Sequence, residues 1–353
     1  MKDYIIIGAG QAGLAMAYYL KKQQKNFIVV DANKEVGAPW LKRWDSLKLF
    51  TPSEFNNLPG MKFPSKKGHY ANKYEVADYL KAYVKEFDIP IAFNQKVHSL
   101  KKEDDVFIIK SDTQRYTSRN VIIATGPFHT PFTPACHKNI DSDIIQIHSE
   151  HYKNPNQLQE GDTLVVGAGD SGVQILDEIS KTNRKVYFSG NTNIGTLPQE
   201  FLGKTLWWWF SKIGFLTANK YSWLGKKLSN NSQPVIGTDV KTLFNKENVT
   251  CVGRTLDAEK KVLVFEKDRL TNIKNIIWAT GFKPNFNWIE DIKLDNKQYP
   301  KNYRGVSEDL EGLFFIGLPW LYTRGSATLG GVKKDAEYLS KFINKKDKKL
   351  QAV

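Results

Sequence analysis

Residues 4–13 read YIIIGAGQAG, and this stretch decides the fold, because a short apolar run leads directly into glycines spaced as GxGxxG. Gly8 permits a tight turn, Gly10 lets the backbone approach a pyrophosphate, and Gly13 lets the next helix lie close to the strand. The helix N-terminus then offers N–H donors to the anion. The stretch therefore predicts a strand, a phosphate-binding turn and a helix over 14–20.

The next apolar run, 27–30, ends in Asp31, eighteen residues after Gly13. A carboxylate at the end of this second strand can accept hydrogen bonds from both ribose hydroxyls of an adenosine. The alternative interpretation of a lone GxGxxG is a glycine-rich turn without a ligand. Strand, helix, second strand and terminal acid together favour a dinucleotide site.

The pattern recurs at residues 163–172, which read TLVVGAGDSG and lead into a second expected helix over 173–179. Two such matches, each after a strand and before a helix, predict a second dinucleotide site. Eighteen residues after Gly172 stands Gly190, at the position where the first unit has its acid. The second site therefore has neither an acid nor an arginine there.

Two further stretches end in Ala-Thr-Gly: residues 120–126 read NVIIATG and residues 275–281 read NIIWATG. Small residues at a strand end let the chain pass close to a bound ligand, whereas a simple strand end is the alternative. Because one stretch follows each nucleotide unit, the duplication favours the ligand interpretation.

Composition excludes several classes of protein. With 353 residues, 41% hydrophobic and 25% charged, the chain is a globular protein of roughly two domains. Its two cysteines, Cys136 and Cys251, form neither a CxxC pair nor a metal-ligand cluster, so a dithiol reductase and a zinc enzyme lose their main support and we expect no metal site. Electrons must then be carried by a non-protein group.

The formal charge of +14 would ordinarily suggest nucleic acid or an anionic membrane as a partner. Only eight of the 51 basic residues are arginine, however, and the lysines are spread along the chain. A nucleic-acid reader more often shows clustered arginine, so we expect a solvated lysine surface and no nucleic-acid partner. No signal peptide and no apolar run of ~20 residues is visible, which predicts a cytoplasmic location.

At this point the chain resembles the flavoproteins with two dinucleotide-binding domains, and within them the bacterial flavin-containing monooxygenase-like proteins, often described as flavoproteins of ion transport. The resemblance covers nearly the whole chain and rests on the stretches at 8–13, 37–52, 148–152 (HSEHY), 167–172, 278–282 (WATGF) and 317–336.

The resemblance implies an α/β fold of two Rossmann-like domains, with the NAD(P) domain inserted into the FAD domain. We expect the FAD domain at residues 1–155 and 272–353. The NAD(P) domain is expected at 156–271, with a tryptophan-rich helical segment at 201–228.

The resemblance also implies FAD in the first cradle and NADH or NADPH in the second, with the segment from Gly317 closing over the flavin. The residues expected to bind the two cofactors are Gly8, Gly10, Gln11, Ala12, Gly13, Asp31, Ala32, Gly37, Trp40, Arg43, Leu47, Thr51, Val97, Ala124, Thr125, Gly126, Gly167, Gly169, Asp170, Ser171, Gly172, Gly190, Asn191, Thr280, Gly281, Gly317 and Leu329.

In this family the flavin carries the hard chemistry: NAD(P)H reduces FAD, and dioxygen then supplies one atom to a sulfide, an amine or a ketone. The expected partners are a small-molecule substrate and dioxygen. Two alternatives stay open. One is a reductase or oxidase that passes electrons to a small acceptor or makes peroxide, and the other is a nucleotide-sensing accessory of an ion transporter without turnover.

The monooxygenase fingerprint, FxGxxxHxxx followed by an aromatic residue, survives only in its second half. Ser142 and Ile144 stand where its Phe and Gly are expected, while His148, Ser149 and Tyr152 match. His148 is a candidate catalytic acid, and fixing the linker between the nucleotide units is its alternative role.

The other departure concerns the flavin ring. Eukaryotic-type relatives place an asparagine four residues after the serine of an SLxxN stretch, and counting from Ser46 gives Phe50 instead. With Trp40 and His148, Phe50 completes the candidate catalytic residues. We expect the loss of this amide to leave oxygenation poorly coupled, so that reducing power leaks to peroxide.

The segment 201–228 contains Trp207, Trp208, Trp209 and Trp223 together with five lysines and no acid. Three interpretations compete: a helical subdomain over the active-site cleft, an interfacial membrane helix with snorkelling lysines, and a homodimer contact. The sequence does not decide between them.

Cofactor preference is predicted from the loop 189–193, which contains no arginine to grip the 2′-phosphate of NADPH. Neutral Asn191 should tolerate both cofactors, and we expect NADH to be accepted at least as readily as NADPH. The alternative is that Arg254 or a lysine supplies the grip from elsewhere in the chain.

Overall fold

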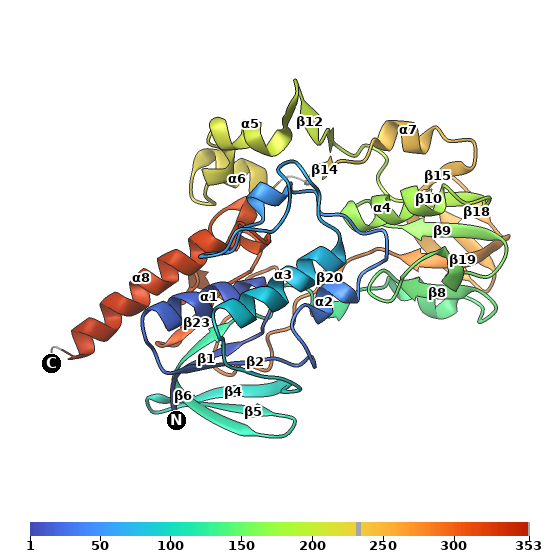
Figure 1. Cartoon of the computed structure of the whole chain (residues 1–353). Coiled ribbons are helices and arrows are strands. Elements are labelled where there is room, and N and C mark those ends of the chain that lie inside the picture. Colours follow the sequence, from blue (N-terminus) through green and yellow to red (C-terminus); the bar gives the residue numbers. More distant parts are fainter. Residues whose placement is uncertain (231–233, 352–353) are drawn as a thin grey trace.

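The computed structural model describes residues 1–230 and 234–351, and it shows two α/β units side by side, each built around its own sheet (Figure 1). The first unit contains both ends of the described chain. The second lies between them in the sequence and carries an extended, mainly helical insert at its edge. The predicted fold class is confirmed.

The sheet of the first unit has the order β21-β22-β23-β6-β1-β2-β3, and β4 and β5 continue it from β6. Its central strands β23, β6, β1 and β2 run parallel. The strands are β1 (Lys2–Ile7), β2 (Phe27–Val30), β3 (Ile91–Ala92), β4 (Val97–Glu103), β5 (Val106–Ser111), β6 (Arg115–Ile123), β21 (Asn302–Tyr303), β22 (Val306–Ser307) and β23 (Leu313–Phe315).

Apolar side chains bury both faces of strand β1. Ile6 belongs to the core cluster beneath the helices, whereas Ile5 and Ile7 belong to the cluster on the opposite face. A strand covered on both sides is expected of parallel sheets, and it explains the unbroken apolar run. The helices of this unit are α1 (Gln11–Lys22), α2 (Ala38–Leu41), α3 (Lys73–Glu86) and α8 (Val332–Gln351), with 3-10 turns η1 (Ser53–Phe55) and η5 (Arg324–Ala327).

The second unit has a parallel sheet in the order β15-β10-β9-β19-β8. Its elements are β8 (Ile145–His148), β9 (Asp162–Val166), α4 (Asp170–Ile179), β10 (Val186–Ser189), α7 (Val240–Phe244), β15 (Val249–Gly253), the antiparallel strands β16 (Thr255–Glu259), β17 (Val262–Phe265) and β18 (Arg269–Leu270), and β19 (Ile273–Trp278). Around them lie β7 (Thr130–Pro131), β20 (Phe282–Lys283), η2 (Ala135–Asn139) and η3 (Pro155–Gln157).

Sheet pairing differs from the domain boundaries expected at 155 and 272. Strands β8 and β19, which we assigned to the FAD domain, hydrogen-bond to each other, and β19 also pairs with β9 of the second sheet. The physical reason is that each parallel sheet needs partners on both sides of its central strand, and β9 has β10 on one side and β19 on the other. We propose to place both boundaries outside β8 and β19.

The insert leaves the second unit after β10 and returns before β15. It contains β11 (Thr196–Leu197), β12 (Glu200–Phe201), β13 (Lys204–Thr205), α5 (Leu206–Lys212), η4 (Phe215–Thr217), α6 (Trp223–Asn230) and β14 (Val235–Ile236). Figure 1 shows α5 and α6 together at the outer edge of the molecule, away from both sheets. In the described parts of the chain, no helix combines the length and apolar character needed to cross a membrane.

Candidate functional site

The two glycine turns have nearly the same backbone. Gly8 and Gly167 both adopt positive φ, 110° and 125°. Each donates its N–H to the end of the neighbouring strand, at the Val30 carbonyl (2.8 Å) and the Ser189 carbonyl (2.9 Å). A Cβ on either glycine would collide with the carbonyl of an Ala-Thr-Gly turn. Both turns therefore require glycine at this position.

The helix after each turn begins at the second glycine. Gly10 and Gly169 are the N-cap residues of α1 and α4, and no described side chain caps either helix end. A Cβ on either residue would meet nothing within 4 Å, so the chain itself does not demand glycine there. An open, uncapped helix N-terminus fits a pyrophosphate, and both cradles pass this test. The helices begin three residues earlier than expected because the third glycine lies inside the first turn.

The Ala-Thr-Gly stretches lie directly beside these turns. Ala124 N donates to the Ile7 carbonyl and Ala279 N to the Val166 carbonyl, both at 2.8 Å. The side chain of Thr280 donates to the Phe132 carbonyl. Packing against the first glycine of each cradle thus explains why the stretch is duplicated. Contact with a ligand stays a prediction for Thr125, Gly126, Thr280 and Gly281.

Asp31 closes the first cradle. Its carboxylate accepts the N–H of Ala9 at 2.6 Å and that of Asn33 at 2.7 Å, which fixes the side chain at the mouth of the glycine turn. Gln95 N donates to the Asp31 carbonyl at 2.8 Å, and this bond brings the start of β4 at Val97 to the same end of the sheet. The first cradle is therefore built as the sequence predicts for an adenosine site.

The matching end of the second cradle carries no charge. Gly190 N donates to the Gly253 carbonyl at 3.0 Å, and Asn191 accepts the N–H of Asn193 at 2.9 Å. The residue after Gly253 is Arg254, whose side chain is exposed. Arg254, the alternative residue for binding a 2′-phosphate, thus follows β15, the strand beside the loop 189–193.

The first helical position differs between the cradles, with Gln11 in α1 and Asp170 in α4. Desolvation by the surrounding protein atoms raises the pKa of Asp170, while the Arg324 guanidinium and the Ile236 N–H act to lower it. Arg324 lies in η5 of the first unit, so a positive charge of the first unit acts on Asp170 of the second cradle.

The loop 37–52 places Arg43 beside two aromatic rings that also pack against each other. Its guanidinium carbon lies 5.4 Å from the ring centroid of Phe128 and 5.5 Å from that of Phe282, which follows the second Ala-Thr-Gly stretch. Burial lowers the pKa of Arg43, and the Glu150 carboxylate opposes this effect. Arg43 therefore lies where the two units meet, whereas Trp40 packs against the core of the first unit.

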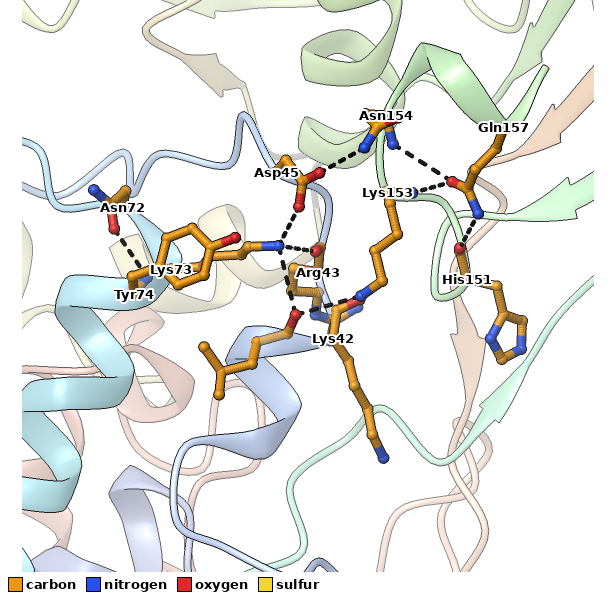
Figure 2. A network of polar contacts seen from close by, with 11 residues as sticks. Lys42, Arg43, Asp45, Asn72, Lys73, Tyr74, His151, Lys153, Asn154 and Gln157 are labelled. Carbon is orange, nitrogen blue, oxygen red and sulfur yellow. Dashed lines mark hydrogen bonds and ion pairs between the residues drawn. The ribbon is translucent and has the colours of Figure 1, made fainter.

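Figure 2 shows the polar network that holds this loop. The ammonium group of Lys73, a residue only 2% exposed, donates to the Arg43 carbonyl at 2.8 Å and to the Asp45 carboxylate at 2.6 Å. The hydrogen bond from Lys73 is the largest cause that lowers the pKa of Asp45. A buried ammonium needs such partners, because an unpaired buried charge is costly.

The same network reaches the linker between the units (Figure 2). Asn154 Nδ2 donates to the second carboxylate oxygen of Asp45 at 2.7 Å, and Lys153 Nζ donates to the Lys42 carbonyl at 2.5 Å. Burial lowers the pKa of Lys153. Sequence reasoning missed these residues, since lysines and asparagines in loops carry no spacing signal.

Both ring nitrogens of His148 are engaged by the backbone. Nε2 lies 3.0 Å from the Gly281 carbonyl, and Nδ1 accepts the Glu150 N–H at 3.1 Å. These two partners place a proton on Nε2, since Nδ1 accepts an N–H, and burial lowers the pKa of His148. This arrangement leaves no free nitrogen for proton transfer and favours the alternative role in fixing the linker.

The insert covers Phe50. Trp207 Nε1 donates to the Phe50 carbonyl at 3.0 Å, and the two rings stack with centroids 6.0 Å apart. Trp207 and Phe210 are buried in a small cluster with Phe50 and Phe55. This part of the insert is therefore a helical cover on the loop 46–56, and its position over an active-site cleft stays a prediction.

The buried amide of this loop is Asn56, which sequence reasoning missed. Thr51 Oγ1 donates to Asn56 Oδ1 at 2.6 Å, and Asn56 Nδ2 donates back to the Thr51 carbonyl at 3.1 Å. The C-terminal segment packs closely here, because a Cβ on Gly330 would collide with the Phe55 carbonyl. The same segment reaches the first cradle, where a Cβ on Gly317 would lie 2.7 Å from the Ala12 methyl group.

The remaining expected contacts lie along the same path. Leu47 and Leu329 are buried in the core cluster of the first unit. Gly37 is the N-cap of α2, where a Cβ would meet Ala77 of α3. Ala32 is exposed beside Asp31. Their contacts with a flavin stay predictions.

The architecture of two open cradles matches known proteins along the whole chain. The profile of the pyridine nucleotide-disulphide oxidoreductase family matches residues 5–199. The chain belongs to this family. It is therefore an oxidoreductase, and the family together with the two cradles confirms the expected cofactor classes, FAD and a nicotinamide dinucleotide.

Among family members, an uncharacterized CzcO-like oxidoreductase of Geobacillus kaustophilus (strain HTA426) is 42% identical over 338 residues, which cover 96% of this chain and 97% of the relative. A flavin-containing monooxygenase from Stenotrophomonas maltophilia has a similar structure, with a TM-score of 0.80, 22% identity and coverage of 97% of this chain and 98% of that one. Cyclohexanone monooxygenase from Rhodococcus sp. Phi1, solved with NADP+, gives a TM-score of 0.74 at 15% identity, over 98% of this chain and 85% of that one.

Proposed function

We propose that this oxidoreductase is a monooxygenase that consumes NADH or NADPH and dioxygen and transfers one oxygen atom to a small sulfide, amine or ketone. The observation that carries the proposal is the pair of uncapped helix N-termini, those of α1 and α4, within one chain. The reaction balances as NAD(P)H, a proton, dioxygen and substrate giving NAD(P)+, water and oxygenated product.

Bound FAD supplies the redox chemistry, accepting two electrons from the nicotinamide and passing them to dioxygen. The protein itself binds the two cofactors and orients them. The N–H groups after Gly10 and Gly169 would hold the two pyrophosphates, and Asp31 would hold a ribose. Arg43, packed on Phe128 and Phe282, would help to exclude water where the units meet.

The positions of the two cysteines support this choice over disulfide reduction. Cys136 lies in η2 and Cys251 in β15, both are free thiols, and both belong to the second unit. Burial raises the pKa of each thiol, which disfavours the reactive thiolate. With only these two cysteines in the sequence, electrons have no CxxC pair to enter.

The substrate classes follow from likeness to proteins of known activity. The structural neighbours include a flavin-containing monooxygenase and a cyclohexanone monooxygenase, and the latter name specifies a ketone. These likenesses support a small, weakly polar substrate that dioxygen-derived oxygen can reach.

A second candidate is an oxidase that releases hydrogen peroxide from the same cofactors. The observation that favours it is Phe50, which lies in an apolar cluster with Trp207 where monooxygenase relatives are expected to offer an amide. An aromatic ring offers no hydrogen bond of the amide kind to an oxygen atom.

The test mixes the protein with NADH, isotopically labelled dioxygen and a panel of sulfides and ketones, and measures NADH consumed, labelled product and peroxide. Monooxygenation predicts label in the product, together with some peroxide from poor coupling. The variant Phe50→Asn should raise the ratio of product to peroxide, whereas Phe201→Asn, on the exposed hairpin tip, should leave it unchanged. Peroxide equal to all NADH consumed, with no labelled product from any substrate, would establish the oxidase instead.

A further inference from the structure

The insert exposes apolar side chains that do not pack against the rest of the protein. Six large apolar side chains between residues 201 and 224 are exposed, half of all such side chains in the described parts of the chain. Trp223 is 77% exposed, Leu202 75% and Ile213 69%. We call the six together the insert surface: Phe201, Leu202, Ile213, Tyr221, Trp223 and Leu224. The six lie in or between β12, α5 and α6, which Figure 1 shows together at one outer edge of the molecule.

The inward side of the insert already has its partners. Trp207 and Phe210 are buried against Phe50 and Phe55, and Trp207 uses its N–H on the Phe50 carbonyl. Stability of the fold therefore accounts for the inner aromatic residues but not for the insert surface. Exposed apolar groups of this size, gathered in one segment, are typical of an interaction site.

Charge indicates the kind of partner. Residues 201–238 contain five lysines and no acid, and none of the five forms an ion pair among the described side chains. Lys227 lies 5.5 Å from the centroid of the Trp223 ring, and both Lys204 and Lys212 lie within 6 Å of the Trp208 ring. Apolar and cationic groups thus alternate along the same surface.

We propose that the insert surface binds the face of an anionic phospholipid bilayer. Aromatic and aliphatic side chains enter the headgroup layer, and the lysines extend along them to the lipid phosphates. Lysines next to an exposed tryptophan on a helix are typical of proteins that bind the surface of an anionic bilayer. The contact is interfacial and does not need a spanning helix. It goes beyond the proposed function, and its failure would leave the oxidoreductase assignment untouched.

A second copy of this chain fits the surface less well. A two-fold dimer places the same patch on both partners, so the exposed lysines of the insert would face the same lysines, and residues 201–238 offer no acid to pair them. Like charges opposed across an interface disfavour association. An anionic lipid surface has the opposite sign.

The experiment measures flotation of the full-length protein with vesicles of phosphatidylglycerol and phosphatidylcholine, and with vesicles of phosphatidylcholine alone. We expect binding to the mixed vesicles at low salt, weakened by added salt, and at least about tenfold weaker binding to neutral vesicles. Vesicles with brominated lipid tails should quench tryptophan fluorescence. The variant Trp223→Phe should lose a large part of that quenching, because Trp223 is 77% exposed whereas Trp207 is buried.

Two pairs of variants locate the contact. Lys226→Glu with Lys227→Glu should weaken binding at least about thirtyfold, whereas Lys66→Glu with Lys67→Glu, an equally exposed pair in the first unit, should not. Trp223→Ser should weaken binding, and Leu256→Ser, 60% exposed on the second unit, should not. All six substituted positions are exposed, so the four variant proteins should fold and retain their flavin.

Three results would overturn the proposal. The first is no flotation with anionic vesicles at low salt. The second is an equal loss of binding in the control variants, Lys66→Glu with Lys67→Glu and Leu256→Ser. The third is a protein that does not bind vesicles and binds another protein through this surface instead. That partner would be a second copy, if Trp223→Ser abolishes self-association, or an acidic protein.

Discussion

The two nucleotide cradles share a backbone and differ in side chains. Gly8 and Gly167 turn the chain alike, and Gly10 and Gly169 leave the helix ends equally open. At the next strand end, however, the first cradle has Asp31 and the second has an uncharged loop. We therefore propose that backbone geometry binds the phosphates, while side chains at strand ends select the dinucleotide.

The largest effect is expected from filling one cradle at a time. Gly10→Val places a side chain where a pyrophosphate would lie, although the chain itself leaves that space open. FAD affinity should fall at least about a hundredfold, because several N–H contacts to an anion are lost together. Gly169→Val should instead preserve FAD content and abolish saturation with NADH.

These two variants are controls for each other, since both should fold. Flavin content after gel filtration and the KM for NADH are the measurements. If Gly169→Val loses FAD while Gly10→Val keeps it, the assignment of the cradles is reversed.

Neutralising the acid of the first cradle comes next. Asp31→Asn keeps the shape of the side chain but removes the charge that would accept both ribose hydroxyls. FAD affinity should fall roughly tenfold to a hundredfold, as for the loss of one charge-assisted hydrogen bond. Titration of the apoprotein with FAD measures this effect. A KM for NADH that changes as much as FAD affinity would count against a role confined to the first cradle.

The preference for NADH or NADPH tests the uncharged loop 189–193, which stands where the first cradle has Asp31. Because Asn191 is neutral, kcat/KM for NADH should equal or exceed that for NADPH, and Asn191→Arg should shift the ratio towards NADPH. Arg254→Ala tests the neighbouring strand end, where Gly253 contacts Gly190. A preference of the native protein for NADPH above about thirtyfold, abolished in Arg254→Ala, would place the missing grip on that arginine.

The smallest effect concerns the first helical position. Asp170→Gln gives the second cradle the residue that Gln11 provides in the first, and it removes a negative charge near the expected pyrophosphate. The KM for NADH should fall roughly twofold to fivefold. In the native protein KM should rise as pH rises through the raised pKa of Asp170, and the variant should lose this slope. An unchanged slope in Asp170→Gln would assign the pH dependence to another group.

The parts of the fold that the sequence predicts are those with strict local geometry. Glycine spacing after an apolar run located both cradles, because a tight turn and close helix packing tolerate few residues at Gly8 and Gly13. The duplication predicted two dinucleotide sites, and the family resemblance supplied the type of cofactor for each. The family resemblance added the order of the domains.

The parts that sequence reasoning missed depend on contacts between distant segments. Strands β8 and β19 join the second sheet through pairing across more than a hundred residues, which no local pattern records. The network of Lys73 with Asp45 and Lys153 depends on where two loops meet, and its residue types are common in any loop. The cover of Trp207 over Phe50 is equally non-local.

The most direct test of the account is the anaerobic reaction of the purified protein with NADH. The account predicts a yellow protein with one FAD per chain, whose flavin absorbance is bleached by NADH in the native protein but not in Gly169→Val. A colourless protein that takes up no added FAD, or a bound flavin that neither NADH nor NADPH reduces, would contradict the assignment of two cofactors to two cradles.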